Sequence, residues 1–518
     1  MRGVHSAVDN IRRSVFTEVA KLAYDGGDLK RVDSIPYTIV PGEIAYHRHD
    51  VFLERAVVAA RTRLALGMSM TSGGPAKPLS ASIEEAYTDE KYFEEPLVNI
   101  IPFACNACPP KQIRITDSCQ GCISHPCMNV CPKDAIYLDE NKHCHIDQSK
   151  CIKCGKCFNQ CPYRAISKIE RPCAAACGMD AIESDEMGRA KINYDKCVSC
   201  GMCLVNCPFG AIADKSQIFQ VIKAMKRNDE VIACVAPAFV GQFGKDATPA
   251  KLKAAMRELG FRDVVEVAIG ADLCTVEEAN DFLREVPAEQ PFMGTSCCPA
   301  WSVMAKKLFP EFQDYISMAL TPMVITARIV KKDHPNAKIA FIGPCAAKKL
   351  EANRRSVRSD VDYVLTFEEL QGMFDAKEID FKTIQTLPED EMLEGTGMGR
   401  GFAVGGGVAA AVVEAIKHID PDREVKVEAA EGLRECRKML MMAKAGKRDG
   451  YLLEGMACPG GCVAGAGTIQ PVKQSAVHIQ QFKSSAKEAS CTTSPYLDRL
   501  NEVEEERSED ELTEVDNI

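Results

Sequence analysis

Residues 151–162 read CIKCGKCFNQCP, and residues 197–208 repeat the same spacing as CVSCGMCLVNCP. Both stretches follow the pattern C-x2-C-x2-C-x3-C-P, in which three thiolates hold one 4Fe-4S cluster and the fourth reaches a neighbouring cluster. Residues 119–132, CQGCISHPCMNVCP, carry the same pattern with a longer middle gap. The spacing therefore predicts a small cluster-binding fold that repeats along residues 99–215.

Sixteen cysteines between residues 105 and 207, with Cys144 set apart, divide into four groups of four. The motifs at 119–132 and 151–162 together resemble a two-cluster ferredoxin. Its ligand exchange implies one group of Cys119, Cys122, Cys127 and Cys161 and another of Cys131, Cys151, Cys154 and Cys157. By analogy, a third group contains Cys177, Cys197, Cys200 and Cys203. The remaining cysteines, which would hold a fourth cluster, are Cys105, Cys108, Cys173 and Cys207. The alternative for the C-x2-C pair at 105–108 is an unused or labile pair of thiols.

Length and composition bound the class of protein. A chain of 518 residues is long enough for several buried cores and needs no disulfide framework, so its 26 cysteines indicate intracellular metal ligation. Glu18 and Lys21 interrupt any apolar signal segment, and no apolar run is long enough to span a membrane. We therefore expect a cytoplasmic protein. The net charge is −10, of which −8 belongs to residues 501–518, so nucleic acid is not an expected partner.

Four segments are expected along the chain. Residues 1–98 are predicted to be mainly helical and have no assigned role; Asp50 is a candidate N-cap for a helix over 51–68, with Phe52, Val57, Leu64 and Leu66 on its buried side. Residues 99–215 form the iron-sulfur part. Residues 216–490 alternate strand-like and helical runs, which predicts an α/β domain with largely parallel strands at 231–237, 264–269, 338–344, 363–367 and 451–456. Residues 491–518 are expected to be a solvated acidic tail.

A second set of cysteines lies in three short runs far downstream, TSCCPAW at 295–301, GPCAAKKLE at 343–351 and EGMACPGGC at 454–462. Two of the runs directly follow predicted strands, and sites in parallel sheets gather beyond the carboxyl ends of strands. Cys298, Cys345, Cys458 and Cys462 could supply four further cluster ligands. The nearby glycines 460, 461, 465 and 467 would let the backbone approach a bulky cofactor.

These three runs resemble the signature segments of the iron-only (FeFe) hydrogenases, over about residues 99–490. The resemblance implies a two-lobed α/β catalytic domain that holds a 4Fe-4S cluster on Cys298, Cys345, Cys458 and Cys462. It also implies a diiron unit with CO, cyanide and dithiolate ligands, bridged to that cluster through Cys462 and bordered by Met456. Cys297 would stay free beside the diiron unit and relay protons.

The same resemblance assigns roles to several polar residues. ADLCTVEEAND at 271–281 implies two relay carboxylates, Glu278 and Asp281, with Ser317 between them, and Lys348 would donate to a cyanide ligand. The alternative for Lys348 and Glu351 is a surface ion pair, and for the two carboxylates an exposed helix face. Gly343, Ala238 and Met323 depart from the family pattern, which implies a divergent, group B-like member.

The implied activity is reversible interconversion of hydrogen with protons and electrons. Ferredoxin or a similar carrier would exchange the electrons, and hydrogenase maturation proteins would build the cofactor. Two alternatives stay open, a hydrogen-sensing homologue with slight turnover and an iron-sulfur assembly factor of the same fold. The remaining cysteines are expected to be small buried side chains; they are Cys144, Cys234, Cys274, Cys436 and Cys491.

Overall fold

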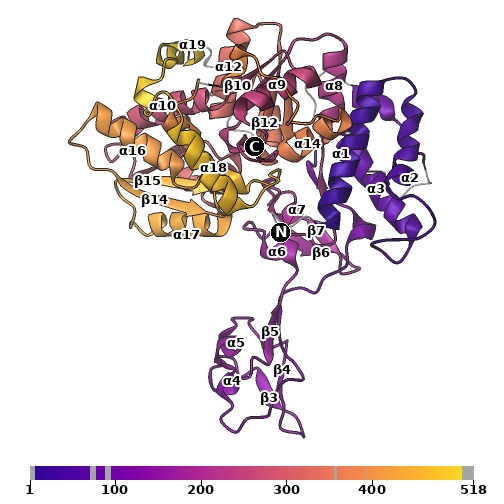
Figure 1. Cartoon of the computed structure of the whole chain (residues 1–518). Coiled ribbons are helices and arrows are strands. Elements are labelled where there is room, and N and C mark those ends of the chain that lie inside the picture. Colours follow the sequence, from indigo (N-terminus) through magenta and orange to yellow (C-terminus); the bar gives the residue numbers. More distant parts are fainter. Residues whose placement is uncertain (1–5, 71–76, 88–94, 355–358, 393, 505–518) are drawn as a thin grey trace.

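The computed structural model describes residues 6–70, 77–87, 95–354, 359–392 and 394–504. Figure 1 shows a large α/β body, helices of the N-terminal residues packed against it, and a small module that projects from it. None of the helices in these ranges is long and apolar enough to cross a membrane. The predicted fold class is confirmed, with iron-sulfur segments followed by a two-lobed α/β domain.

The first lobe is built on a parallel sheet in the order β10-β9-β12-β13. Its strands are four of the predicted apolar runs, which are apolar along most of their length because helices cover a parallel sheet. They are β9 (Val231–Val235), β10 (Asp263–Glu266), β12 (Lys338–Gly343) and β13 (Tyr363–Thr366). Helices that contact these strands are α8 (Ile218–Lys226), α9 (Pro249–Leu259), α12 (Pro322–Asp333) and α14 (Phe367–Ala376).

The second lobe has a smaller parallel sheet, in the order β11-β15-β14. Only β15 (Tyr451–Met456) was predicted. The sequence missed β11 (Phe292–Gly294) because it is three residues long, and β14 (Lys426–Glu431) because it is an edge strand with mostly exposed side chains. Helices of this lobe are α11 (Pro299–Leu308), α16 (Gly407–Ile419) and α17 (Leu433–Lys444). Helix α10 (Ala268–Glu285) contacts α12 of the first lobe and α16 of the second, so it joins the two lobes.

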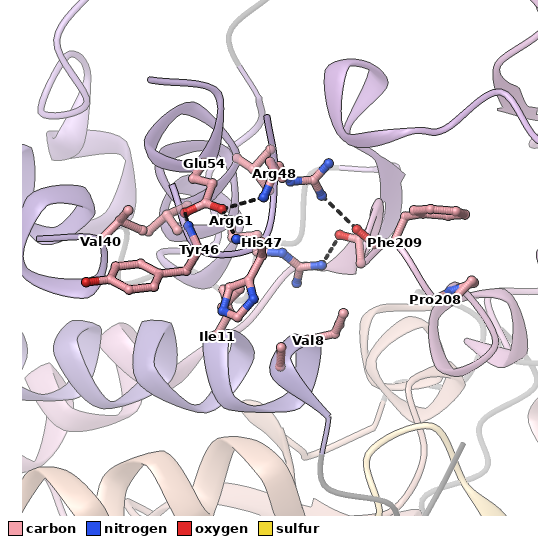
Figure 2. Close-up of a pocket in the computed structure, with 14 residues that line it drawn as sticks. Val8, Ile11, Val40, Tyr46, His47, Arg48, Glu54, Arg61, Pro208 and Phe209 are labelled. Atoms are coloured by element: carbon pink, nitrogen blue, oxygen red, sulfur yellow. Dashed lines mark hydrogen bonds between the residues drawn. The ribbon is translucent and has the colours of Figure 1, made fainter. Parts of the chain in front are cut away.

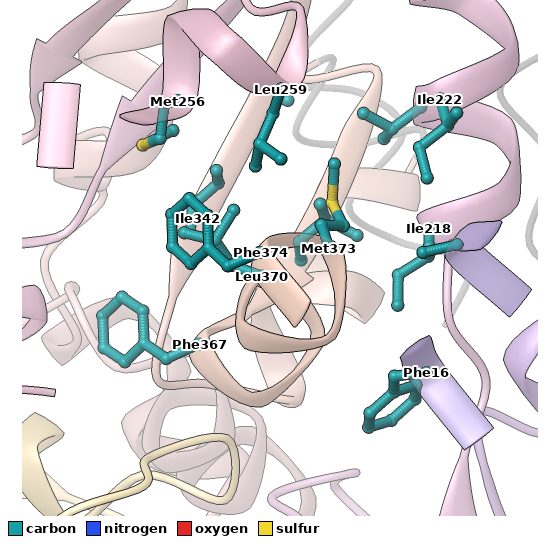
Figure 3. Close-up of a cluster of buried hydrophobic side chains, with 14 of the residues drawn as sticks. Phe16, Ile218, Ile222, Met256, Leu259, Ile342, Phe367, Leu370, Met373 and Phe374 are labelled. Carbon is teal, nitrogen blue, oxygen red and sulfur yellow. The ribbon is translucent and has the colours of Figure 1, made fainter. Parts of the chain in front are cut away.

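The N-terminal helices share a core with the first lobe. Helix α1 (Ala7–Asp25) begins at a capping box formed by Ser6 and Asp9, and it packs against α14, α8 and α3 (Val51–Ala65). Figure 3 shows Phe16 of α1 beside side chains of α8 and α14 in this cluster. The helix α2 (Ile35–Ile39) lies against α3. Residues 6–70 are therefore an integral layer of the body.

The predicted helix over 51–68 is confirmed as α3, with the Asp50 side chain accepting the backbone N–H groups of Phe52 and Leu53. Val57, Leu64 and Leu66 are buried as expected. The expectation for Phe52 is wrong, because its side chain is 73% exposed. Phe52 lies in the first turn of α3, on the side away from the body's core.

The iron-sulfur residues form a structural repeat of short helix, turn and strand. In each repeat an Ala-Ile pair leads into a strand that begins at the isoleucine. The residue two positions before each of these isoleucines has a positive φ; these residues are Asp134, Arg164, Asp180 and Gly210. The strands that begin at these isoleucines are β3 (Ile136–Leu138), β5 (Ile166–Ile169), β6 (Ile182–Ser184) and β8 (Ile212–Asp214). Their antiparallel partners are β4 (Cys144–Ile146), β2 (Gln112–Ile115), β7 (Ala190–Ile192) and β1 (Val98–Ile100).

The repeats fall into two places. Strands β2 to β5, with helices α4 (Pro126–Asn129) and α5 (Lys156–Gln160), form the module that stands away from the body in Figure 1. Strands β1, β6, β7 and β8, with α6 (Pro172–Ala175) and α7 (Met202–Val205), lie against the body. The module therefore contains the cysteine motifs at 119–132 and 151–162, and the body contains the motif at 197–208.

The acidic tail begins later in the chain than predicted. Cys491 and Val503 are buried, and α19 (Leu500–Glu504) packs against α12, because these apolar side chains complete cores of the α/β domain. Residues 491–504 are thus part of the domain. The rest of the predicted tail, 505–518, lies outside the described residues.

Candidate functional site

The four distal cysteines converge from loops at the carboxyl ends of strands. Cys298 precedes α11, Cys345 lies between β12 and α13 (Ala347–Asn353), and Cys458 and Cys462 follow β15. The Cys298 thiol accepts the backbone N–H of Ala457 at 3.5 Å, which places it beside the loop of Cys458. Burial, and then the neighbouring Cys298, raises the pKa of Cys345 to about 11.

Cys462 belongs to the same group. Burial raises the pKa of its thiol, and Cys298 and Cys345 are the next largest causes. Cys458 shares its tight loop, since its carbonyl accepts the N–H of Gly461 at 3.0 Å. The fold therefore brings the four predicted thiols of this set into one region from sites up to 164 residues apart.

The glycines around Cys462 are explained by protein packing. A Cβ at Gly461 would lie 2.4 Å from the backbone nitrogen of Gly405, and one at Gly465 would lie 2.3 Å from the carbonyl oxygen of Pro344. Gly461 also has a φ of +78°. These positions need glycine so that the loop can pack against its neighbours, and the expected approach to a cofactor stays a prediction.

Glu278 is a fully buried carboxyl group on α10. One of its oxygens accepts the backbone N–H of Ser296 at 2.7 Å. Burial raises its pKa from 4.5 to about 7, although hydrogen bonds from Ser296 and Ser317 act in the opposite direction. A carboxyl group with this pKa can both take up and release a proton near neutral pH.

Cys297 lies beside that carboxyl group. Burial raises the pKa of its thiol well above the ordinary value, and Glu278 is the next largest cause, followed by Cys274 and Cys298. Cys297 thus stays a thiol next to a titrating acid. The predicted partners Cys297, Glu278 and Ser317 are brought together.

Asp281 occupies a different environment. It lies one turn further along α10, and its carboxylate accepts a bond of 2.6 Å from Arg284, whose side chain is 61% exposed. Asp281 therefore lies closer to solvent than the fully buried Glu278.

Lys348 and Glu351 form a buried pair on α13. Lys348 Nζ lies 2.6 Å from a Glu351 carboxylate oxygen and donates to the Thr321 hydroxyl at 3.1 Å. The two residues are 8% and 3% exposed, so the alternative of a surface ion pair is wrong. Burial lowers the pKa of Lys348, but Glu351, Cys345 and Cys297 together raise it above its usual value, which places the ammonium group near both thiols.

Three buried polar atoms near these thiols have no hydrogen-bond partner among the described residues. They are the second oxygen of Glu278 and the hydroxyls of Thr295 and Ser296. Buried polar groups are almost always satisfied, so a water or a bound group is expected there. Four convergent thiols and these unsatisfied atoms fit the iron-sulfur and diiron cofactor that the sequence implies.

Sequence reasoning missed two residues of the site. Cys274 is buried on α10, where Glu278 is the largest cause after burial of its raised pKa, so it lies beside the Glu278 and Ser296 pair. Glu454 is fully buried on β15, and its carboxylate accepts the N–H groups of Gly406 and Ala409 at 2.8 Å. A charged residue inside the apolar run YLLEGM was the available signal. Met456, the last residue of β15, is also buried.

Two groups of accessory thiols lie within the body. Burial and then Cys200, Cys197 and Cys177 raise the pKa of Cys203, so the third predicted group is close together. Burial and then Cys207 raise the pKa of Cys173 to about 11, and Cys105 contributes as well. The fourth group also lines one small cavity, whose cysteines are Cys105, Cys108, Cys173 and Cys207.

The module holds the other two groups in one small core. Cys131, Cys151 and Cys154 all raise the pKa of Cys157, after burial, which matches the predicted exchange of Cys131 between motifs. Cys119, Cys127 and Cys161 belong to the same core, and Cys122 lies near Cys127. Cys144 joins them with its sulfur 3.7 Å from that of Cys127.

The third accessory group adjoins the distal thiols. Cys345 is among the causes that raise the pKa of Cys200 to about 12, after burial, Cys177 and Cys197. A Cβ on Gly201 would lie 2.5 Å from Ala466 and 3.3 Å from Ala346, which flank Cys462 and Cys345. Within the described residues, no group of three or more His, Cys, Asp or Glu side chains is arranged to hold a single metal ion.

The fold and these thiol groups define an iron-sulfur protein with a buried thiol site in its α/β domain. Family models agree: "4Fe-4S binding domain" matches residues 145–167, "LdpA Fe-S cluster-binding domain" matches 167–218, and "Iron only hydrogenase large subunit, C-terminal domain" matches 229–466. The chain belongs to the iron-only hydrogenase large-subunit family.

Curated relatives are distant and include both hydrogenases and iron-sulfur cluster assembly factors. Iron hydrogenase 1 of Clostridium pasteurianum is 28% identical over 75% of this chain and 76% of its own length. The periplasmic Fe hydrogenase large subunit of Nitratidesulfovibrio vulgaris is 31% identical over 63% of this chain and 86% of its own. The cytosolic Fe-S cluster assembly factor narfl of Danio rerio is 26% identical over 44% of this chain and 68% of its own. The family therefore includes both hydrogenases and assembly factors at similar identity.

Proposed function

We propose that this chain is a hydrogenase, which converts one H2 into two protons and two electrons and catalyses the reverse reaction. The observation that carries the proposal is the buried Cys297 thiol beside Glu278, at the edge of four convergent cysteines. A protein that only holds a cluster needs the four ligands but has no use for a neighbouring acid with a pKa of about 7.

Four thiolates would hold the active-site 4Fe-4S cluster, those of Cys298, Cys345, Cys458 and Cys462. Cys462 would also bridge to the diiron unit with its CO, cyanide and dithiolate ligands. When bound, this cofactor supplies the site at which the bond of H2 is broken or formed. The chain's own residues bind it, orient it and move protons.

The proton path begins at Cys297. Its thiol can pass a proton to Glu278, which titrates near neutral pH, and the Ser317 side chain is also a neighbour of that carboxyl group. Asp281, which contacts the exposed Arg284, would complete the path to solvent. The unsatisfied oxygens of Glu278 and Ser296 mark where a water would connect the groups.

Lys348 holds a fixed positive charge near the thiols. Glu351 and Thr321 orient its ammonium group, and the remaining N–H donor is available to a cofactor ligand such as cyanide. Because the pair is buried, removal of either partner would leave a charge without compensation.

Electrons would travel through the accessory clusters. The group of Cys200 adjoins Cys345, the group of Cys173 and Cys207 follows it, and the module offers two more. We propose four accessory 4Fe-4S clusters, with ferredoxin or a similar protein as the external carrier. Hydrogenase maturation proteins would supply the diiron unit.

The test is a hydrogen assay on the full chain, produced anaerobically together with maturation proteins. We expect hydrogen evolution from reduced methyl viologen and hydrogen uptake with the oxidised dye. Cys298→Ala should abolish both, while Glu258→Gln, a change at an exposed position of α9, should leave both unchanged. Absence of activity in a preparation that matures a known hydrogenase would contradict the proposal.

The second candidate is an iron-sulfur assembly factor. It is favoured by the assembly-factor relatives, which match this chain at an identity similar to that of the hydrogenases. Such a protein would transfer clusters to an acceptor and evolve no hydrogen. Cluster transfer to an apo-protein without hydrogen turnover would therefore favour this candidate.

A further inference from the structure

A pocket of about 440 Å³ lies between the N-terminal helices and the loop that follows Cys207. Figure 2 shows its walls, which come from α1, from α3, from the 40–48 segment and from residues 208–210. Its volume is in the range of sites that bind small organic molecules. The family models matched to this chain begin at residue 145, so none of them covers the N-terminal part of this pocket.

The charge in the pocket is positive. Arg48 and Arg61 both line it, and neither guanidinium forms an ion pair within the ranges that the structure describes. Glu54 is the carboxylate among the lining residues, and it accepts the backbone N–H groups of Tyr46, His47 and Arg48. Its negative charge is therefore held by the turn of the 46–48 segment.

Arg61 is the more buried of the two, at 6% exposed. Its pKa is lowered to about 10, chiefly by burial and then by Arg12, while Cys207, Asp214 and Glu368 act in the opposite direction. A buried guanidinium that is not paired with a carboxylate is costly unless something compensates its charge. Donation to the carbonyls of Gly210 and Ile212 compensates part of it.

Both arginines keep free donors. Arg48 donates to the carbonyls of Phe209, at 2.8 Å, and Ala104, at 3.5 Å, and Arg61 uses one nitrogen for both of its bonds. A guanidinium has five N–H groups in a planar fork that suits carboxylate and phosphate oxygens. The apolar part of the lining is formed by Val8, Ile11, Val40, Val57 and Val58.

We propose that this pocket binds a small organic anion. Its single phosphate or carboxylate group contacts Arg48 and Arg61, and its apolar body lies on the side chains of α1 and α3. The inference goes beyond the proposed hydrogenase function and does not depend on it.

The bound anion would lie beside a candidate cluster ligand. Arg61 is close enough to Cys207 for their charges to interact, and Arg48 holds the backbone of Ala104, next to Cys105. A negative charge near a cluster makes it harder to reduce. Binding should therefore lower the reduction potential of the cluster held by the Cys207 group.

The test is calorimetry on the anaerobically purified full chain with its accessory clusters. AMP and hexanoate are the two probes, one for each acidic group, and adenosine and inorganic phosphate are their separated parts. We expect saturable binding of AMP or of hexanoate, and much weaker binding of adenosine and phosphate. The probe that binds identifies the acidic group; no binding of either at millimolar concentration overturns the proposal.

Variants locate the site. Arg48→Gln should weaken binding about tenfold or more, the effect of one charge-assisted hydrogen bond. Ala7→Trp should block the pocket while both arginines stay in place. Arg55→Gln is the matched control. Like Arg48, Arg55 donates to two backbone carbonyls, those of Val40 and Gly42, but it does not line the pocket.

If the probe bound equally well to the wild type, Ala7→Trp and Arg48→Gln, this pocket would be rejected as its binding site. An EPR-monitored redox titration with and without the bound probe then tests its effect on the cluster. An unchanged potential for every accessory signal would contradict the link to Cys207. Neither readout requires hydrogen turnover, so failure of the proposed function and failure of this inference can be told apart.

Discussion

Replacement of Glu278 by Gln should lower activity and raise stability at the same time. The carboxyl group is fully buried, and its pKa is raised from 4.5 to about 7. A shift of this size corresponds to about 3 kcal/mol between the protonated and ionised forms. Glutamine keeps the size of the side chain and can still accept the N–H of Ser296, but it cannot carry a proton.

The sign of the stability change depends on pH. The folded protein binds this proton more tightly than the unfolded chain, so its contribution to stability is complete below pH 4.5 and is lost as the pH rises through about 7. Glutamine does not undergo that loss. At pH 8 the variant should therefore be more stable than the wild type by up to about 3 kcal/mol, and at pH 4.5 the two should be equal.

The activity change has the opposite sign. A positioned proton carrier contributes about 100-fold to 10,000-fold to a rate, so hydrogen evolution at pH 7 should fall by that factor. The assays are methyl viologen turnover and thermal unfolding at the two pH values. Glu258→Gln, the same change at an exposed position of α9, is the control and should alter neither.

Two results would refute this reasoning about Glu278. One is near-normal turnover of Glu278→Gln, which would remove the carboxyl group from the proton path. The other is a stability difference of the same size at pH 4.5 and pH 8, which would show that Glu278 does not titrate in this range. If the substitution instead disturbed packing, the variant would be less stable than the wild type at both pH values, which distinguishes a packing defect from titration.

Three further predictions concern the thiols and the buried ion pair. Cys297→Ala should lower turnover at least about 100-fold and leave the iron content unchanged, whereas iron loss would make Cys297 a ligand. Lys348→Met should lower the free energy of unfolding by about 3–5 kcal/mol because Glu351 is then buried without a partner, and the Lys348→Met/Glu351→Met double variant should recover much of it; an unchanged unfolding curve for the single variant would contradict the buried pair. Cys207→Ala should remove one accessory cluster, seen as four fewer iron atoms per chain, and unchanged iron would reject the fourth cluster.

Much of the fold could be predicted because its signals are local. An apolar run such as KIAFIGP is long enough to identify a buried parallel strand, and β12 is found there. Asp50 is at the N-cap of α3 because its side chain accepts neighbouring N–H groups, an interaction set by adjacent residues. The edge strand β14 was missed because its exposed positions carry no such pattern.

The sequence predicted those site residues that recur at fixed spacing, and it missed those that become neighbours only through tertiary packing. The cysteine motifs indicate cluster groups directly, since ligands of one cluster recur at fixed intervals. The position of Cys274 and Glu278 beside Ser296 and Cys297, by contrast, results from the packing of α10 against the 295–297 loop. The pocket of Arg61 similarly forms only when the 40–48 segment and residues 208–210 meet.

The measurement that tests the central claim most directly is the infrared spectrum of the anaerobically matured chain. The account predicts bands of iron-bound CO and cyanide, which are lost in Cys462→Ala because that thiolate is proposed to join the diiron unit to the cluster. A preparation that has its full complement of 4Fe-4S clusters but shows no such bands, under conditions that mature a known hydrogenase, would contradict the hydrogenase assignment.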